Sequence, residues 1–334
     1  MRSALLERIG GLGIGDADLL LTATHTHSGP AGFARPKIWQ FVAADTYSQE
    51  LFDRYVASMA AAVEQAVARL APARLAIGSG PIEDAVRNRR DHPEWLDPTA
   101  TVVRIDTPAG EPLAAVVHFA IHPTVLTEEN LLLSADVAGS IVRATAAATG
   151  AEAIFLNGAE GDVSPTPPDR GPEGVAALGE RIGTAAAAIW RTLEPAEVHR
   201  LDTVRLERPT EKVELNLAAC AGLDGHSGKW MKELDSPYLS TVAPIAGLRI
   251  DDHAFVTVPG EPIVELGEAI EAAGEELGFA GTVVIGLTDD YLGYVLTEDE
   301  YREGGYEACG AWYGPRLGAT ILEGATAALR ALAD

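Results

Sequence analysis

The spacing of apolar and polar positions predicts strands and helices along nearly the whole chain. The helical period is clearest over 46–70, where apolar residues recur every three or four positions, alanine is frequent, and Pro72 follows. Short apolar runs bounded by Gly, Asp or Pro are typical of buried strands. We predict strands at 17–25, 73–79, 100–106, 112–121, 152–157, 199–217, 245–258 and 282–287, and helices at 46–70, 137–148, 174–193, 262–277 and 318–333.

This mixture predicts an α/β domain of mixed α+β character, with mixed β-sheets flanked by helices. The 334 residues contain no polar low-complexity linker, so one large domain over 1–334 is favoured over two closely packed ones. A stretch rich in Gly, Ser, His and Asp at 218–242 is the best candidate for a mobile loop over a site.

Charge and composition exclude some partners. The chain has 49 acidic and 25 basic residues, a formal charge of −24, which would repel nucleic acid and anionic lipid surfaces. No segment reaches the ~18 uninterrupted apolar residues of a membrane-spanning helix. We therefore expect a cytoplasmic protein, or a secreted one if the true N-terminus is missing, and the sequence is compatible with an oligomer. Cys220 and Cys309 are expected to be free thiols.

Histidines end two of the predicted strands. His25 and His27 lie in the segment THTHSGP, and on a strand they would project to the same side, roughly 6 to 7 Å apart. This spacing fits a metal ligand with a neighbour, a catalytic dyad, or two polar residues at a strand end. His122 ends a second strand in FAIHP, so the two strand ends could converge, whereas His118 is expected to be a hydrogen-bonded core histidine.

Three further segments carry polar residues at turns. NGAEGDVSP presents Asp162 and Ser164 after a strand, in the crevice position that α/β sheets favour for sites. Ser164 fits a nucleophile, a hydrogen-bond donor or a turn former, and its surroundings are not the G-x-S-x-G elbow of serine hydrolases. Glu261 follows a Pro-Gly turn in VPGEP, where a glutamate also complements a helix dipole.

Tyrosines gather in one late segment of a chain that is only 6% aromatic. A buried aromatic lining explains this clustering, and so does a phenol that acts as a metal ligand or oxyanion donor. The tyrosines are Tyr291, Tyr294, Tyr301, Tyr306 and Tyr313.

Taken in order, THTHSGP, FAIHP, GDVSP, PGE and GY…GGYE…YGP resemble the catalytic domain of the neutral/alkaline non-lysosomal ceramidase family, zinc amidases that split ceramide into a fatty acid and sphingosine. The resemblance runs over most of the chain and implies a ceramidase-like catalytic domain. It also implies that Zn2+ is held by His25, His122, Glu261 and Tyr294.

The resemblance further implies roles around the metal. His27 would neighbour the metal or face the substrate, and Tyr306 would support the oxyanion. Asp162 and Ser164 would flank the scissile bond. Arg89 in VRNRR would match the Asn-Arg element of the family, a role for which Arg87 and Arg90 are alternatives.

The chemistry of these residue types is compatible with zinc. Two imidazoles and a carboxylate form an ordinary catalytic zinc set, whereas tyrosine is a less usual ligand because its pKa is about 10. Zinc lowers the pKa of water from about 15.7 to about 7, so we expect zinc-activated water to attack, with Ser164 positioning substrate or water. Direct attack by Ser164 is the alternative mechanism.

Departures from the family widen the choice of substrate. Members normally begin well before the first histidine motif and carry an immunoglobulin-like domain after the catalytic one, and neither is present in this sequence. We expect a small-molecule or lipid-like N-acyl substrate, either ceramide or a smaller amide or ester. The competing hypotheses are a metal-free serine esterase that uses Ser164 and His27, and a metal-stabilised binding protein without turnover.

Overall fold

Two four-stranded sheets form the centre of the computed structural model, which describes residues 1–36, 40, 45–90, 92–210 and 239–334. The first sheet has the order β1-β3-β4-β5 and the second β11-β9-β8-β7. Each sheet is mixed, because one parallel pair, β4–β5 or β9–β11, lies beside antiparallel pairs. The strands are β1 (Arg74–Pro81), β3 (Thr99–Asp106), β4 (Pro112–Phe119), β5 (Glu152–Asn157), β7 (Leu201–Pro209), β8 (Val242–Ile250), β9 (His253–Thr257) and β11 (Gly281–Ile285).

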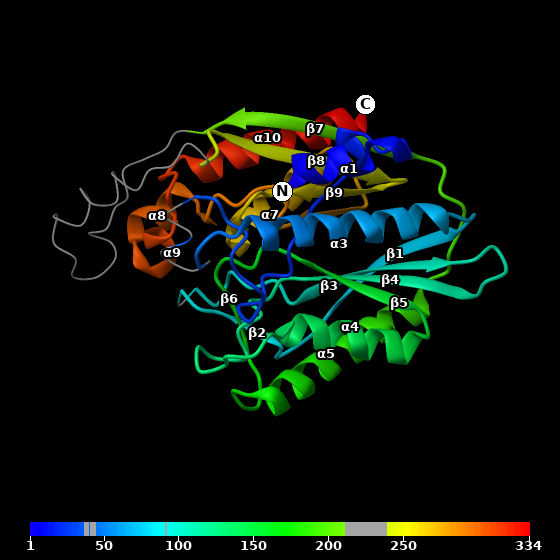
Figure 1. The fold of residues 1–334 in the computed structure, drawn as a ribbon, viewed down its shortest axis with the longest axis horizontal. Coiled ribbons are helices and arrows are strands. Elements are labelled where there is room, and N and C mark those ends of the chain that lie inside the picture. Colours follow the sequence, from blue (N-terminus) through cyan, green and yellow to red (C-terminus); the bar gives the residue numbers. More distant parts are fainter. Residues whose placement is uncertain (37–39, 41–44, 91, 211–238) are drawn as a thin grey trace.

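Helices cover the outer face of each sheet, so the layers run helix, sheet, sheet, helix (Figure 1). The first sheet packs against α4 (Asp136–Thr149) and α5 (Pro172–Thr192). The second packs against α7 (Val264–Glu276) and α10 (Leu317–Ala333). This arrangement confirms the predicted fold of mixed sheets flanked by helices.

Side chains alternate between the two faces of the first sheet, so each face contributes to a different hydrophobic core. Val102 and Val117 face α4 and α5, whereas their neighbours Val103 and Val116 face the second sheet. His118 also lies between the sheets, where its Nε2 donates a hydrogen bond of 2.7 Å to the carbonyl of Val284. His118 is therefore the hydrogen-bonded core histidine that the sequence predicts.

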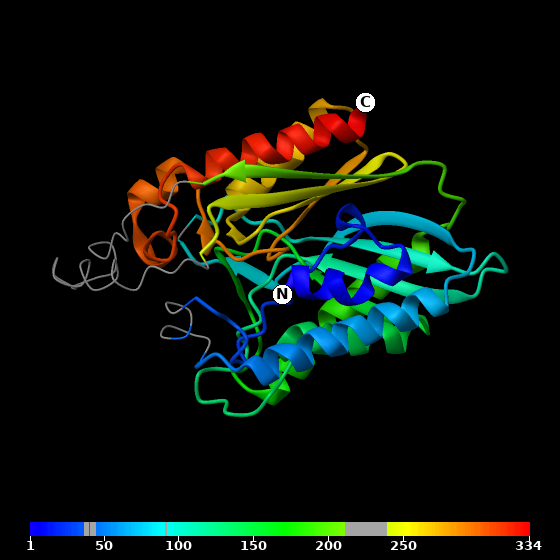
Figure 2. The same ribbon diagram turned by 45° about the horizontal axis from the view of Figure 1, so that its top comes forward.

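Two N-terminal helices, α1 (Arg2–Ile9) and α3 (Gln49–Ala68), pack along one side of the sandwich (Figure 2). Their contact is built from apolar residues at helical spacing: Leu5, Ile9, Phe52, Val56 and Ala60. The Ser48 side chain caps α3 by accepting a hydrogen bond from the backbone N–H of Leu51.

Short elements gather where the metal-ligand candidates lie. Strands β2 (Val86–Asn88) and β6 (Val163–Pro165) pair antiparallel, and β10 (Glu261–Pro262) and β12 (Tyr294–Val295) pair parallel. The short helices α8 (Glu298–Glu303) and α9 (Gly305–Cys309) follow β12, towards the left of Figure 1. Two 3-10 helices, η1 (Gly10–Leu12) and η2 (Asp16–Asp18), precede the first histidine motif.

Several predicted boundaries are wrong. Residues 17–25 do not form a strand, because only Thr22 makes an isolated bridge, to Thr288. The single strand predicted at 245–258 is a hairpin of β8 and β9, since Asp251 adopts a φ of +51° and turns the chain.

Two predictions extend outside the described residues. Most of the mobile loop predicted at 218–242 lies there, up to residue 238. The strand predicted at 199–217 is found as β7, which ends at Pro209, and residues 211–217 lie outside the described part. Cys309 is disulfide-bonded, which corrects the expectation of free thiols. Within the described part of the chain, none of the helices combines the length and apolar character needed to cross a bilayer.

Candidate metal centre

His25 is placed by an extended segment that crosses the ends of both sheets. The backbone N–H of Ala23 donates to the carbonyl of Leu287 at 3.1 Å, and the Asn157 side chain donates to the carbonyl of Thr24 at 3.3 Å. His25 itself adopts a left-handed φ of +67°. The strand geometry expected for His25 and His27 is therefore wrong, and their Nε2 atoms lie 3.3 Å apart.

His122 follows the end of β4 and is buried and firmly oriented. Its Nδ1 donates a hydrogen bond of 2.7 Å to the carbonyl of Glu160, and its backbone N–H donates to the carbonyl of Val163 at 3.1 Å. Because a carbonyl can only accept, the proton of the neutral ring is on Nδ1. The lone pair of Nε2 is then free to bind a metal.

Glu261 lies on β10, beside Tyr294 in the register of β12. The turn at Gly161 packs directly against it, since a Cβ at Gly161 would meet the Glu261 carbonyl oxygen at 2.7 Å. The Tyr291 hydroxyl donates to Oε1 of Glu261. Oε2 is directed elsewhere, to 3.3 Å from Nε2 of His25 and 3.2 Å from Nε2 of His122.

These atoms fit a bound cation. Nε2 of His122 and Oε2 of Glu261 are buried and have no hydrogen-bond partner among the described residues. Two lone pairs that face each other at 3.2 Å repel unless a proton or a cation lies between them. Ligands about 2.0 to 2.1 Å from a tetrahedral zinc ion lie about 3.4 Å apart, close to the spacing here, and two histidines with a glutamate are a catalytic zinc set.

The charges of this centre shift the pKa values of its members. Burial raises the pKa of Glu261, but His25 and His122 outweigh burial and hold it well below its ordinary value. Burial and the charge of Glu261 raise the pKa of Glu160. His27 is an exposed residue, but its Nε2 faces the ring of His25. Desolvation lowers the pKa of His27 to about 4, and the charges of His25 and His122 contribute to this shift.

Tyr294 is bonded to an arginine. Nη2 of Arg89 donates to the Tyr294 hydroxyl at 2.9 Å and to the Gly161 carbonyl at 2.7 Å, while Nε of Arg89 donates to Glu307 at 2.6 Å. The Tyr294 ring stacks on that of His122, with centroids 6.5 Å apart. Burial and the charge of Glu261 raise the pKa of Tyr294, which keeps the phenol neutral at ordinary pH.

A solvent-open hollow of about 370 Å³ adjoins the centre. Tyr306 stands in it with 70% of its surface exposed, and the Arg89 guanidinium lies 5.5 Å from the Tyr306 ring. Of the three arginines considered, Arg89 is the one bonded to Tyr294, whereas Arg90 pairs with two glutamates and Arg87 is exposed. The hollow is lined by Arg89, Arg90, Glu303, Gly304, Gly305, Tyr306 and Glu307.

Asp162 and Ser164 lie on the turn beside the centre. Both carboxylate oxygens of Asp162 are engaged, one by the Asn88 side chain at 2.7 Å and the other by the backbone N–H of Val264 at 3.0 Å. Asp162 thereby ties β2 to the start of α7. Ser164 is half-buried, and within the described residues no hydrogen bond joins its hydroxyl to a histidine.

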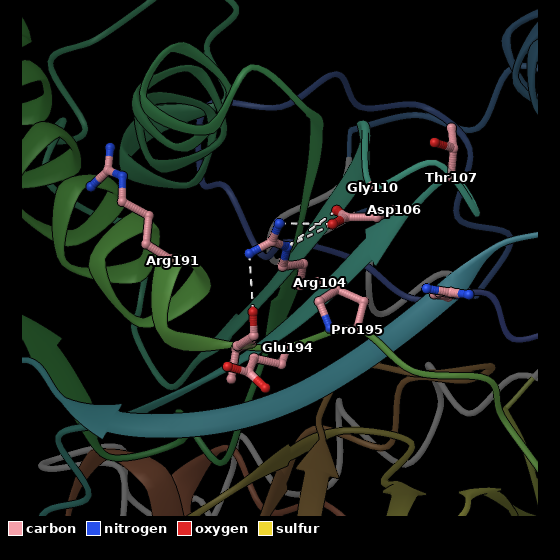
Figure 3. A pocket seen from close by; sticks show the side chains of 9 residues that line it. Arg104, Asp106, Thr107, Gly110, Arg191, Glu194 and Pro195 are labelled. Carbon is pink, nitrogen blue, oxygen red and sulfur yellow. Dashed lines mark hydrogen bonds and ion pairs between the residues drawn. The ribbon is translucent and has the colours of Figure 1, made fainter.

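A second hollow, of about 430 Å³, lies at the far end of the first sheet (Figure 3). It is remote because Asp106 pairs with Pro112 at the start of β4, whereas His122 follows the end of β4. Of its three arginines, Arg104 already pairs with Asp106 at 2.7 Å and donates to the Leu193 carbonyl at 3.0 Å.

Sequence reasoning missed Glu160, which is fully buried beside Glu261. The sequence did contain an indication, because a glutamate between Ala159 and Gly161 is unusual in a turn of small residues and would not be selected for packing. It also missed Tyr291, whose hydroxyl orients Glu261. The tyrosine cluster pointed to that residue without assigning it a role.

Known proteins resemble the chain in sequence and in fold. The family described as "Neutral/alkaline non-lysosomal ceramidase, N-terminal" matches residues 4–167. The neutral ceramidase of Pseudomonas aeruginosa is 26% identical over 89% of this chain and 57% of its own length, and that of Mycobacterium tuberculosis is 24% identical over 90% and 61%. The crystal structure of the Pseudomonas aeruginosa neutral ceramidase superposes with a TM-score of 0.84 at 25% identity, covering 99% of this chain and 64% of that one.

The chain thus spans about three fifths of the length of these curated relatives. The matched region contains the first histidine motif, FAIHP and GDVSP, and the structural match extends over the segments that carry Glu261 and Tyr294. The matches in sequence and in fold together support the assignment of this chain to the neutral/alkaline non-lysosomal ceramidase family.

Proposed function

We propose that the protein is a zinc-dependent hydrolase of N-acyl amide bonds, with Zn2+ held by His25, His122 and Glu261 and with Tyr294 beside it. The observation that carries the proposal is the position of Oε2 of Glu261, buried without a hydrogen-bond partner among the described residues and 3.3 and 3.2 Å from two imidazole nitrogens. Relatives named neutral ceramidases support the amide bond as the target.

When bound, zinc would supply an acidified water and a Lewis acid for the carbonyl. Tyr294 accepts a hydrogen bond from Arg89, so its own hydroxyl proton can be donated to the carbonyl oxygen of the substrate. Tyr306, exposed in the adjoining hollow, would reach the same oxygen from the solvent side. His27, at the rim of the centre, would hydrogen-bond the substrate or the attacking water.

Asp162 and Ser164 would act from the turn that flanks the scissile bond. We assign Asp162 a positioning role, because both its oxygens already hold Asn88 and the start of α7. Ser164 would orient substrate or water. As a nucleophile it would need a base within hydrogen-bond reach, and none of the described histidines is bonded to it.

Three consecutive leucines favour a lipid-like substrate over a small one. Leu131, Leu132 and Leu133 are 93%, 77% and 76% exposed. Their loop is tied to the first histidine motif, because the Asn130 side chain donates to the Ser28 hydroxyl at 2.9 Å. An exposed apolar tip beside the centre suits contact with an acyl chain or the apolar phase that contains it.

The test of the reaction is zinc content combined with turnover. We expect one zinc per chain in the purified protein, release of fatty acid from an N-acyl sphingosine, and loss of turnover on chelation that zinc restores. Full activity of metal-free protein, with a fluorophosphonate bound to Ser164, would instead support the serine esterase. Metal-bound protein inert towards a panel of N-acyl amides and esters would support a binding protein.

The substrate class has its own test. Replacing Leu131, Leu132 and Leu133 together by Ser should lower hydrolysis of ceramide in phosphatidylcholine vesicles by roughly tenfold, with a short-chain soluble amide unaffected. The matched control is Leu201→Ser, which removes a leucine 66% exposed at the far end of β7. Equal loss on both substrates would contradict a role for these leucines in lipid contact.

A further inference from the structure

Asn157 is a buried amide whose hydrogen-bonding groups are all engaged. It ends β5 and has an exposure of 0%. Its Oδ1 accepts hydrogen bonds from the backbone N–H groups of Ile121 and Gly158, both at 3.1 Å. Its Nδ2 donates to the carbonyl of Ile121 at 2.9 Å and to the carbonyl of Thr24 at 3.3 Å. A side-chain amide has two acceptor lone pairs and two N–H donors, so all four are used.

Two of these partners directly precede the histidines of the candidate metal centre. Ile121 comes before His122, and Thr24 comes before His25. Ile121 follows β4, and β4 is paired with β5 up to its last residue, so this side of the link belongs to the first sheet. Thr24 lies in the extended segment outside the named strands. Asn157 therefore ties the segment of His25 to the sheet that carries His122.

The two histidines differ in what orients their rings. Nδ1 of His122 donates to the carbonyl of Glu160 at 2.7 Å, which fixes that ring. Within the described part of the chain, no hydrogen bond joins Nδ1 of His25 to another residue, while its Nε2 faces Glu261 and His27. The direction of the His25 ring is therefore set by its backbone.

The backbone of His25 is strained and is held from both sides. Its φ of +67° lies in the left-handed region, which a residue with a Cβ enters only at a cost in free energy. On one side the Asn157 amide holds the carbonyl of Thr24, and on the other the N–H of His27 donates to the carbonyl of Pro123 at 3.4 Å. Without the first bond, the chain could rotate towards a negative φ and turn the imidazole out of the centre.

We propose that Asn157 is a positioning residue of the candidate metal centre, because it places His25 relative to His122 by bonding the residue before each. The proposal rests on the proposed function in one respect, that Zn2+ occupies this centre. The Asn157 side chain uses all its hydrogen-bonding groups on main-chain partners, so it acts on the ion only through the position of an imidazole. Residues that orient a metal ligand typically change metal affinity by about 10- to 100-fold when they are replaced.

The test compares zinc affinity in variants of the full chain, by competition with a chromophoric chelator. Asn157→Ser removes the amide, adds no charge and leaves room for a water beside Ile121. It should weaken zinc binding by about 10- to 100-fold. The matched control is Thr145→Val, which removes another buried polar group, bonded to the Gly183 carbonyl in the outer helix layer. The control should change zinc affinity less than ~3-fold.

A cobalt spectrum separates positioning from a merely structural role. Co2+ at saturating concentration reports the geometry of its ligands through its visible absorption bands. A displaced His25 should shift these bands in Asn157→Ser, whereas Thr145→Val should keep the wild-type spectrum. Weaker zinc binding with unchanged cobalt bands would mean that the loss comes from the fold, and it would overturn the proposal.

Thermal melts of the metal-free proteins show which variants fold. Asn157→Leu, uncharged and similar in size to asparagine, replaces Asn157→Ser if that variant does not fold, and the same loss of affinity and shift of the bands are expected of it. Failure of both variants to fold would assign Asn157 to the stability of the fold and overturn the positioning role. Wild type that binds no zinc would overturn the proposed function as well, whereas unchanged affinity in a folded Asn157 variant would overturn the positioning role alone.

Discussion

Two buried charged clusters lie side by side in this protein and neutralise their charges in different ways. The arginine cluster consists of Arg89, Arg90, Glu300 and Glu307. The candidate metal centre consists of His25, His122 and Glu261, with the buried Glu160 beside them. The Arg89–Tyr294 hydrogen bond of 2.9 Å connects the arginine cluster to the tyrosine beside the centre.

The arginine cluster contains its own cations. Arg90 pairs with Glu300 at 2.5 Å and with Glu307 at 2.9 Å, and Glu307 also pairs with Arg89 at 2.6 Å. Its two positive and two negative charges cancel, and no buried side-chain atom of this cluster lacks a partner among the described residues. The charges of this cluster are balanced by its own residues, so it requires no bound ion.

The candidate metal centre has two carboxylates and two imidazoles, and among the described residues no arginine or lysine is paired with these carboxylates. Four of its buried atoms lack partners among the described residues: Nε2 of His122, both oxygens of Glu160 and Oε2 of Glu261. Of two adjacent and equally buried sites, only the arginine cluster has its hydrogen bonds and charges satisfied by the described residues. A divalent cation, as proposed above, would complete the candidate metal centre.

The largest effect expected is from Glu261→Gln, which removes the carboxylate that both imidazoles face. Zinc content should fall well below one per chain, and turnover of an N-acyl amide should fall at least ~1000-fold. Plasma emission spectrometry and a fatty-acid release assay measure the two quantities. A variant that keeps both its zinc and its turnover would place the cation elsewhere.

Breaking the arginine cluster should affect folding and leave metal content intact. Arg90→Met removes the arginine partner of the buried Glu300 and one of the two arginine partners of Glu307, which costs about 3 to 5 kcal/mol of unfolding free energy. Urea denaturation measures this loss, and zinc per folded chain should stay at one. Loss of zinc with unchanged stability would mean that the two clusters have the opposite roles.

Adding zinc to metal-free protein should stabilise the wild type by about 2.7 kcal/mol at a free zinc concentration of 100 times its dissociation constant. The reason is that the ion binds the folded centre and not the unfolded chain. Thermal melts with and without zinc measure the shift, and His122→Ala is the comparison that should lose it. An equal shift in both proteins would show that zinc binds outside the centre.

The smallest effect is expected from a third group of carboxylates, which surrounds Glu271. Burial, followed by Asp97, Glu268 and Glu275, raises the pKa of Glu271 to about 8. A carboxyl whose pKa is higher in the folded than in the unfolded protein destabilises the fold as it ionises. The free energy of unfolding should therefore fall as the pH rises from 4.5, the pKa in the unfolded chain, to about 8.

Glu271→Gln should therefore stabilise the protein at pH 8 by on the order of 1 kcal/mol, because the group is partly solvated. At pH 4 the variant and the wild type should melt alike. Differential scanning calorimetry at the two pH values measures the contrast. A variant less stable than the wild type at pH 8 would show that the Glu271 charge is compensated.

Periodicity was enough to predict most of the fold. The helix predicted at 46–70 contains α3, and the strand predicted at 152–157 is β5. Both segments bury one side or lie in a core, so the spacing of apolar residues reports their geometry directly. The strand predicted at 17–25 failed because its apolar run packs as an irregular extended segment, a distinction that hydrophobicity does not encode.

The candidate site was predictable as a set of segments and not as a geometry. Motif order pointed to His25, His122 and Glu261. The structure brings Nε2 of both histidines within 3.3 Å of Oε2 of Glu261. The left-handed backbone of His25 and the burial of Glu160 beside Glu261 were not predictable. Both depend on partners more than a hundred residues away in sequence, such as Gly286.

X-ray diffraction data collected on either side of the zinc absorption edge, from crystals of protein purified without chelator, would show whether a cation occupies the candidate metal centre. We expect one strong anomalous peak about 2.0 to 2.2 Å from Nε2 of His25, Nε2 of His122 and Oε2 of Glu261. Well-ordered side chains at these positions with no anomalous peak among them would show that no zinc ion is bound there.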